Sequence, residues 1–328
     1  MTSPSSTGST PGSTSDRTSD RNPIGTHVLV GKGLVAGALA DAERLGCETL
    51  QVFVGNPRGG ALTPGKPAED EAFRVAAAQR GIRTFIHAPY LVNLGSPTAR
   101  TYENSVAVVA HNLRRAAEIG AEGVVVHTGS YVDTQVDPQG AAQRHAAALR
   151  QVREGLRQVR EGLLPILETL GEEGPWLLLE PTAGQGRSLC AGVEDLGDYL
   201  GALDHHPRAG ICLDTCHVFA AGAPLDEAGG AAATVERIGE IAGPGKLRLV
   251  HANDSKDVRG AMKDRHEQIG KGHIGADAFV ELFAHPALEG VPFVLETPGS
   301  REPGGDVDVL KALRDVARRG AGAQPGAQ

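Results

Sequence analysis

The chain has 328 residues, a formal net charge of −8 and a sequence pI of about 5.8. This length is enough for one large domain with a substantial core. The acidic balance argues against a protein that binds nucleic acid through its own net charge alone, although this count leaves out bound metal ions. The four cysteines lack CxxC spacing, which argues against a disulfide framework and favours a reducing, cytoplasmic compartment.

The first segment of the chain has the composition of a disordered tail. Residues 1–22 contain twelve Ser or Thr together with Pro and Gly, and few apolar side chains. Such a segment buries too little apolar surface to offset the entropy lost on ordering. The stretch 320–328, GAGAQPGAQ, predicts a second disordered tail, which leaves 23–319 as one domain. No apolar run in the chain is long enough to span a bilayer, so we expect no contact with a membrane.

Between the tails, apolar runs alternate with segments of helical character. The predicted strands are 24–30, 49–54, 83–87, 123–127, 176–180, 210–214, 247–251 and 292–296. Helices are predicted at 34–45, 68–80, 98–119, 193–203, 227–241 and 307–318, and a further helix contains the tandem heptad 149–162. Eight strand–helix units in a chain of this size predict an α/β fold, the (β/α)8 TIM barrel, as a single domain.

Six of the predicted strands end in a side chain that can bind a metal ion. These last residues are His87, His127, Glu180, Asp214, His251 and Glu296. One such ending carries little information, but six of them indicate a shared centre. Parallel barrels place their chemistry at the C-terminal ends of their strands, so we expect the six side chains to meet there.

Three further ligand-type residues follow the strands closely. His217 lies three residues after Asp214, and the long loop after 247–251 carries Asp264 and His266. Long ordered loops are usually functional. Alternate residues of an extended segment point the same way, so Asp264 and His266 can chelate one ion together. The nine residues supply imidazole and carboxylate without thiolate, which suits zinc better than manganese or iron.

Several of these segments together resemble the endonuclease IV family of zinc-dependent apurinic/apyrimidinic endonucleases. The matching segments are HAPYLVNLGS from His87, LEPTAGQG from Leu179, LDTCHVFAAG from Leu213, HANDSK from His251, DRHEQIGKGHIG from Asp264 and LETP from Leu295. The match extends from about Gly25 to Pro298, and all nine ligand positions are filled in order. The resemblance implies a TIM barrel that holds three zinc ions.

The resemblance also assigns the ligands of each ion. The first ion would be bound by His87, His127 and Glu180, the second by Glu180, Asp214, His251 and Glu296, and the third by His217, Asp264 and His266. Glu180 would bridge the first two ions and is the predicted catalytic residue. Three divalent cations against four carboxylates leave a formal charge of about +2, so an acidic protein can present a cationic centre to a phosphate.

The implied substrate is double-stranded DNA with an abasic site. The implied reaction hydrolyses the phosphodiester 5′ to that site, which leaves 3′-OH and 5′-deoxyribose phosphate ends, and related enzymes also trim blocked 3′ ends. The family flips the abasic nucleotide out of the helix, which is least costly where no base pair must be broken. Arg58, Tyr90 and Leu91 match the loop positions that fill the gap, and we expect the protein to act as a monomer.

Some positions depart from the family pattern. Gly59 and Gly60 follow Arg58, where a Trp is usual nearby, and Thr128 follows His127, where a Pro is common. The first departure lies in a loop that the resemblance assigns to DNA contacts. Neither departure removes a metal ligand.

Two other function classes are compatible with part of the pattern. Glu180, Asp214, His251 and Glu296 alone would suit a metal-dependent sugar isomerase or epimerase on the same barrel. The other five ligand-type residues would have no role in such a one- or two-ion site. A non-catalytic DNA-binding relative is the second alternative, and the complete ligand set argues against it.

Overall fold

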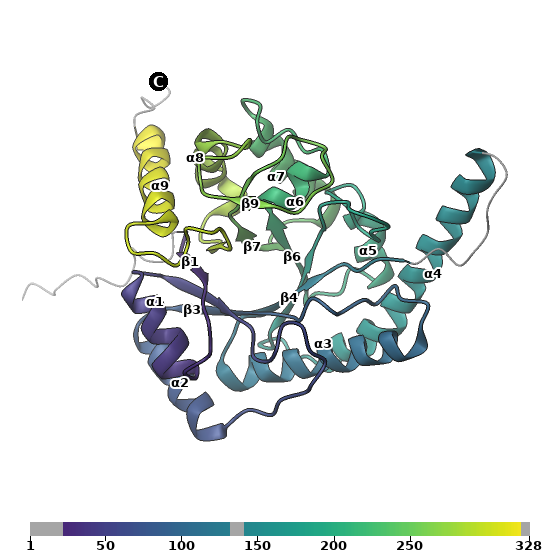
Figure 1. Ribbon diagram of the computed structural model, residues 1–328, viewed down its shortest axis with the longest axis horizontal. Coiled ribbons are helices and arrows are strands. Elements are labelled where there is room, and N and C mark those ends of the chain that lie inside the picture. Colours follow the sequence, from purple (N-terminus) through teal and green to yellow (C-terminus); the bar gives the residue numbers. More distant parts are fainter. Residues whose placement is uncertain (1–21, 132–140, 323–328) are drawn as a thin grey trace, which may run out of the picture.

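The computed structural model describes residues 22–131 and 141–322 of the chain (Figure 1). Most of the two predicted tails therefore lies outside the described residues. Asn22, assigned to the first tail, is buried and donates side-chain hydrogen bonds to the backbone oxygens of Leu288 and Val291. The last helix, α9 (Asp306–Gly322), continues beyond Arg319. The folded region thus includes Asn22 and residues 320–322, which the sequence had assigned to the tails.

Eight parallel strands close into a barrel, which confirms the predicted TIM-barrel fold. Their order around the barrel is β1, β2, β3, β4, β5, β6, β7 and β10, and β10 pairs with β1. The strands are β1 (Ile24–His27), β2 (Thr49–Val52), β3 (Arg83–His87), β4 (Gly123–His127), β5 (Trp176–Glu180), β6 (Ala209–Asp214), β7 (Leu247–His251) and β10 (Phe293–Leu295). A separate antiparallel pair, β8 (Asp254–Ser255) and β9 (His266–Glu267), was not predicted.

The helices form a ring outside the barrel (Figure 1). Besides α9 they are α1 (Ala40–Arg44), α2 (Pro67–Gln79), α3 (Ala99–Ile119), α4 (Ala141–Leu167), α5 (Leu196–Ala202), α6 (Thr215–Ala220), α7 (Gly230–Ala242) and α8 (Ala276–Ala284). The predicted helix 34–45 is a π-helical turn, Leu34–Leu39, followed by α1, and a 3₁₀ turn spans Pro286–Leu288. Sequence patterns did not predict α6 or α8. Within the described ranges, no helix combines the length and apolar character that a membrane span requires.

The inward-facing side of the strands sets the position of the site. Six side chains fill the inside of the barrel, one from each of six strands: Phe85, Val125, Leu178, Cys212, Leu249 and Val294. Successive side chains of a strand point to opposite faces, so the residue two positions later points inward again. Two positions after these six lie His87, His127, Glu180, Asp214, His251 and Glu296. The strand period therefore aims all six ligand-type side chains at one region above the apolar core.

Charged groups pair with one another at the opposite end of the barrel. Arg83, at the start of β3, forms a two-pronged ion pair with Glu122, just before β4. The guanidinium groups of Arg208 and Arg248 lie 5.3 and 4.6 Å from the ring centroid of Trp176, within cation–π range. These contacts stabilise the amino end of the strands and leave the carboxyl end for chemistry.

Candidate metal centre

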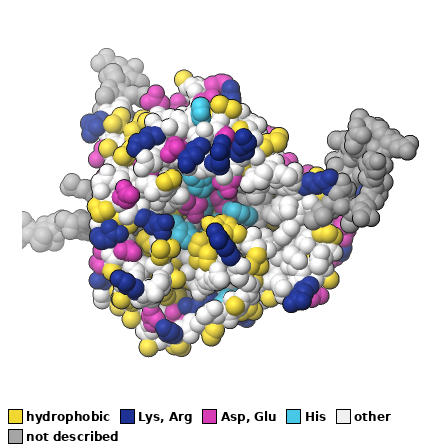
Figure 2. All heavy atoms as spheres, in the orientation of Figure 1, with side chains coloured by type: hydrophobic (Ala, Val, Ile, Leu, Met, Phe, Trp, Pro, Cys, Tyr) yellow, Lys and Arg dark blue, Asp and Glu magenta, His cyan; other side chains and the backbone are white. Residues whose placement is uncertain are grey.

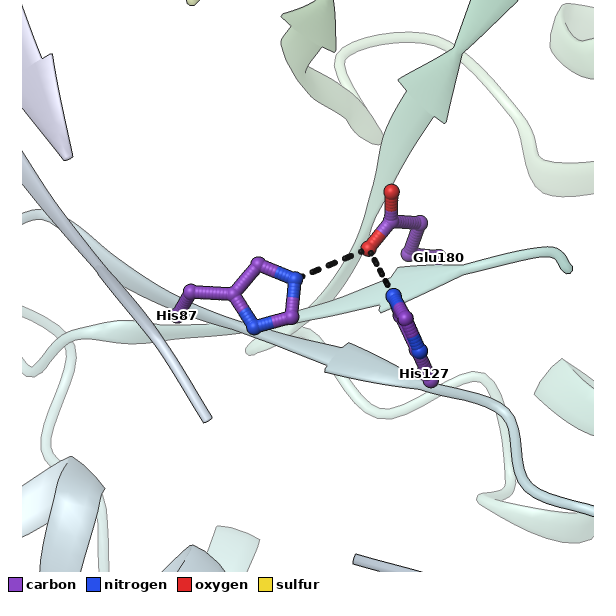
Figure 3. A group of neighbouring side chains, drawn as sticks. All are labelled: His87, His127 and Glu180. Atoms are coloured by element: carbon purple, nitrogen blue, oxygen red, sulfur yellow. Dashed lines mark ion pairs between the residues drawn. The ribbon is translucent and has the colours of Figure 1, made fainter. Parts of the chain in front are cut away.

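Glu180 lies at the centre of the candidate site, with a side chain that is fully buried. Its Oε2 lies 3.3 Å from Nε2 of His87 and 3.2 Å from Nε2 of His127, as Figure 3 shows. Oε2 has no hydrogen-bond partner among the described residues. A buried carboxylate oxygen without a hydrogen bond is costly unless a cation meets it. These three side chains, which also lie close enough to share one ion, are the first cluster.

The other oxygen of Glu180 faces a second cluster. Glu180 Oε1 lies 2.9 Å from Nδ1 of His251. The same Nδ1 lies 3.6 Å from Oε2 of Glu296 and 3.9 Å from Oδ2 of Asp214. Three carboxylates therefore converge on one imidazole nitrogen, and Glu180 joins the first cluster to the second through its two oxygens.

A third cluster is built from β6, α6 and the loop before β9. Asp214 caps α6, because its Oδ1 accepts a hydrogen bond from the backbone N–H of His217 at 2.8 Å. This cap places His217 on the first turn of the helix. Nε2 of His217 and Nε2 of His266 lie 3.2 and 3.1 Å from the same Oδ1 atom of Asp264. Nε2 of His266 is buried and has no hydrogen-bond partner among the described residues.

The long loop after β7 carries Asp264 and His266 of the third cluster, and contacts within the loop hold it in place. β8 and β9 pair with Ser255 opposite His266. The buried Asp254 carboxylate accepts backbone N–H groups from Gly270, Gly272 and Ile274. A Cβ at Gly272 would lie 2.4 Å from the backbone oxygen of Ser255, so this approach requires glycine. These contacts hold His266 at the site.

Burial and neighbouring charges shift the pKa values of the site in opposite directions. Burial raises the pKa of Glu180, but nearby histidines, His251 foremost, outweigh burial and hold this pKa well below its usual range. Burial lowers the pKa of His217 and His266, but Asp214 and other carboxylates raise these values to about 10 and about 9. Both imidazoles therefore hold protons at neutral pH when no cation is bound. A cation must displace those protons, so its affinity falls as the pH falls.

The donor set fits zinc. Five imidazoles and four carboxylates surround two buried atoms, Glu180 Oε2 and His266 Nε2, that otherwise lack hydrogen bonds. The thiols of Cys212 and Cys216 also lie near these clusters. Burial raises the pKa of Cys212 to about 12 and raises the pKa of Cys216 well above its usual range, which disfavours the thiolate form of both. Both are free, small buried side chains.

The site is open on one face of the molecule. Figure 2 shows histidine and acidic side chains together in a hollow at the centre of this face, with Lys and Arg side chains around it. The local arrangement thus differs from the acidic balance of the whole chain, because cationic side chains surround the histidine and acidic groups (Figure 2).

The residues predicted to contact DNA lie in two loops that are hydrogen-bonded to each other. Arg58 is in the loop after β2, and Tyr90 and Leu91 are in the loop after β3. The backbone N–H of Tyr90 donates to the backbone oxygen of Pro57 at 3.0 Å, which joins the two loops. Tyr90 is 56% exposed, and its ring centroid lies 5.6 Å from that of His87. The loop after β3 therefore presents an aromatic ring beside the first cluster.

Sequence patterns missed two polar residues that support the clusters. Asn253 donates to Oδ2 of Asp214 at 2.7 Å and accepts the backbone N–H of Glu296 at 2.9 Å. The sequence feature that could have identified Asn253 is its position two residues after His251, because alternate residues of an extended segment point the same way. Gln51 contacts His251 and Glu296. The sequence feature that could have identified it is a polar side chain inside the apolar run TLQVFV.

A closed parallel barrel with histidines and carboxylates gathered at the carboxyl ends of its strands defines a metal-binding TIM barrel. The family model of xylose isomerase-like TIM barrels matches residues 39–319. The chain is 52% identical to the probable endonuclease 4 of Streptomyces avermitilis over 297 residues, which cover 90% of this chain and 91% of that protein. It also matches the crystal structure of endonuclease IV from Thermus thermophilus with a TM-score of 0.72 and 31% identity, over 90% of this chain and 99% of that chain. The chain therefore belongs to the endonuclease IV family.

Sugar-converting enzymes share only the fold with this chain. The crystal structure of a D-tagatose 3-epimerase-like protein matches with a TM-score of 0.65 and 18% identity, over 91% of this chain and 99% of that chain. Such low identity carries no argument about activity. The sugar isomerase or epimerase alternative is therefore the weaker one.

Proposed function

We propose that this protein is a zinc-dependent DNA-repair endonuclease. It hydrolyses the phosphodiester 5′ to abasic sites in double-stranded DNA, leaves 3′-OH and 5′-deoxyribose phosphate ends, and also trims blocked 3′ ends. The observation that carries this proposal is the convergence of nine ligand-type side chains in three clusters, two of them joined by Glu180. A one- or two-ion sugar site has no use for so many ligands. Membership of the endonuclease IV family supports the same reaction.

Three zinc ions fit the three clusters. The first cluster is His87, His127 and Glu180, the second is Glu180, Asp214, His251 and Glu296, and the third is His217, Asp264 and His266. When bound, clustered zinc ions activate water and neutralise charge on a reacting phosphate. Glu180 holds the first two positions together, since Oε2 faces one cluster and Oε1 faces the other.

The protein's own side chains orient the substrate around this centre. His217 of the third cluster lies 3.4 Å from Oε1 of Glu180, whereas His87 faces Oε2, so all three clusters lie around this one carboxylate. Tyr90 lies beside the first cluster, and its aromatic face can stack on a base next to the gap left by a flipped nucleotide. Arg58, in the neighbouring loop, can fill that gap.

A cleavage assay tests the proposed function. The substrate is a duplex with one tetrahydrofuran abasic analogue, which cannot undergo β-elimination, and an undamaged duplex is the control. We expect a nick 5′ to the analogue with a 3′ end that a polymerase extends. EDTA should abolish the nick and added zinc should restore it. Absence of cleavage by zinc-loaded protein would rule out the proposal, and turnover of a ketose instead would establish the sugar alternative.

The zinc content is the next expected result. Three clusters with nine ligands predict three zinc ions per chain. Elemental analysis of protein prepared without chelators, normalised to protein concentration, measures this number. A value of one ion or none in active protein would contradict the three-ion assignment.

Arg58→Ala should weaken binding to abasic duplex more than binding to undamaged duplex, because insertion at the lesion is not a general phosphate contact. The affinity for abasic duplex should fall on the order of tenfold, which corresponds to about 1.4 kcal/mol of binding free energy. Fluorescence anisotropy at several salt concentrations measures both affinities, and Arg44→Ala, an exposed arginine on α1, is the control. Equal weakening on both duplexes, with a smaller salt slope, would make Arg58 a backbone contact instead.

The proposal extends to assembly and location. All nine ligand-type residues come from one chain, so a monomer has a complete site. The four cysteines are free and buried, which fits a reducing, cytoplasmic compartment.

A further inference from the structure

Gln51 is a fully buried polar residue in β2 that reaches toward the second cluster. Its amide nitrogen lies 2.7 Å from Oε1 of Glu296 and 3.0 Å from Nδ1 of His27. Its amide oxygen lies 2.9 Å from Nε2 of His251. Three residues on three other strands or strand ends therefore meet one side chain, and every polar atom of that side chain has a partner.

The carboxylate of Glu296 fixes which way the amide points. Oε1 of Glu296 lies 2.7 Å from the amide of Gln51, and a carboxylate that binds a metal ion is ionised. An ionised carboxylate only accepts hydrogen bonds, so the amide group beside it must be the NH2 of Gln51. The amide oxygen then faces His251 and accepts the N–H of Nε2.

This hydrogen bond determines which nitrogen of His251 can bind a metal ion. With the proton on Nε2, the lone pair of the neutral ring is on Nδ1. Nδ1 is the nitrogen that faces Glu180, at 2.9 Å, and Glu296, at 3.6 Å. The same amide also holds the Glu296 carboxylate beside this nitrogen.

We propose that Gln51 is the positioning residue of the second metal site, which fixes His251 with Nδ1 toward the ion and holds Glu296 next to it. This inference rests on the proposed metal centre and adds to it a residue that binds no ion itself. Partners behind metal ligands fix the tautomer and the ring orientation, and their loss typically lowers metal affinity by about 10- to 100-fold.

The chain of hydrogen bonds that runs through Gln51 ends at His27. The amide nitrogen of Gln51 also lies 3.0 Å from Nδ1 of His27, which accepts the second N–H of the amide when that ring nitrogen carries no proton. The arrangement uses two amide donors and one amide acceptor, so a carboxylate at position 51 cannot reproduce it.

Two substitutions and one control test the proposal. Gln51→Met keeps the length and removes all hydrogen bonds, and Gln51→Glu also places a carboxylate against Glu296. The control is Thr49→Val in the same strand, which removes a buried hydrogen bond to the backbone oxygen of Arg83 at the far end of the barrel. Zinc affinities are measured by competition with a chromophoric chelator, and thermal melting reports the fold of each variant.

We expect Gln51→Met to lower the affinity for one of the three zinc ions by about 10- to 100-fold and Gln51→Glu to lower it further, whereas Thr49→Val leaves all three unchanged. In the zinc-loaded wild-type protein, long-range proton–nitrogen spectra should show His251 protonated at Nε2. Zinc affinity of Gln51→Met equal to wild type would overturn the proposal. Protonation of His251 at Nδ1 in the zinc-loaded wild-type protein would also overturn it. This measurement does not depend on whether the variants fold.

The outcomes separate this proposal from the proposed function. If Gln51→Met loses one zinc ion and the zinc-loaded wild-type protein does not cleave abasic DNA, the positioning role is supported and the endonuclease function is rejected. Protein that cleaves abasic DNA with zinc affinities independent of Gln51 would reject only the positioning role.

Discussion

Glu180→Gln should reduce cleavage of abasic duplex by about 10³-fold or more while the protein stays folded and binds the duplex. The amide keeps the shape of the side chain, but it offers one neutral oxygen in place of two charged ones. Glu180 faces the first cluster with Oε2 and the second with Oε1, so the substitution weakens both. Loss of metal-centred charge stabilisation is worth several kcal/mol, and about 1.4 kcal/mol corresponds to each factor of ten in rate.

Single-turnover cleavage of the tetrahydrofuran duplex, together with the zinc content, measures this effect. Glu122→Gln is the matched control, because Glu122 pairs with Arg83 at the opposite end of the barrel. The control should cleave at the wild-type rate with three zinc ions. A Glu180→Gln protein that keeps most of its cleavage rate would show that Glu180 does not join the two ions.

The barrel and the centre of the site could be predicted because both follow from the strand period. Apolar runs buried on both sides are typical of a parallel sheet, and a polar residue at the end of such a run lies at its carboxyl edge. Glu180 illustrates this, because Leu178 fills the barrel and the next inward-facing position is the carboxylate. Local pattern alone therefore places six side chains in one region.

Residues that act through contacts distant in sequence could not be predicted in the same way. Gln51 meets His251 at a separation of 200 positions, and no periodicity in either segment indicates that contact. The antiparallel pair of β8 and β9 is two residues long on each side, too short to give an alternating pattern. Oδ1 of Asp264 and Nε2 of His266 lie 3.1 Å apart, although only His266 lies in a strand.

His217→Ala should leave a folded protein that has lost one zinc ion, binds abasic duplex and cleaves it about 10²- to 10³-fold more slowly. Nδ1 of His217 lies 3.1 Å from the backbone oxygen of Pro181, so it donates there and leaves Nε2 to face Asp264 at 3.2 Å. Removal of this ring leaves Asp264 and His266 as the only two protein ligands of the third ion. Two ligands are too few to hold zinc tightly.

The first and second clusters keep every ligand in His217→Ala. The loss of the third zinc ion can therefore be measured separately from binding of the abasic duplex. Zinc content should fall from three to two, and affinity for the abasic duplex should stay near that of the wild type. His111→Ala is the control, because His111 on α3 contacts the backbone oxygen of Thr63 away from the clusters. In a sugar isomerase with a smaller site, His217 would not bind a metal ion and its loss would be mild. Cleavage at the wild-type rate with three zinc ions retained would therefore refute the assignment of His217, with Asp264 and His266, to the third site.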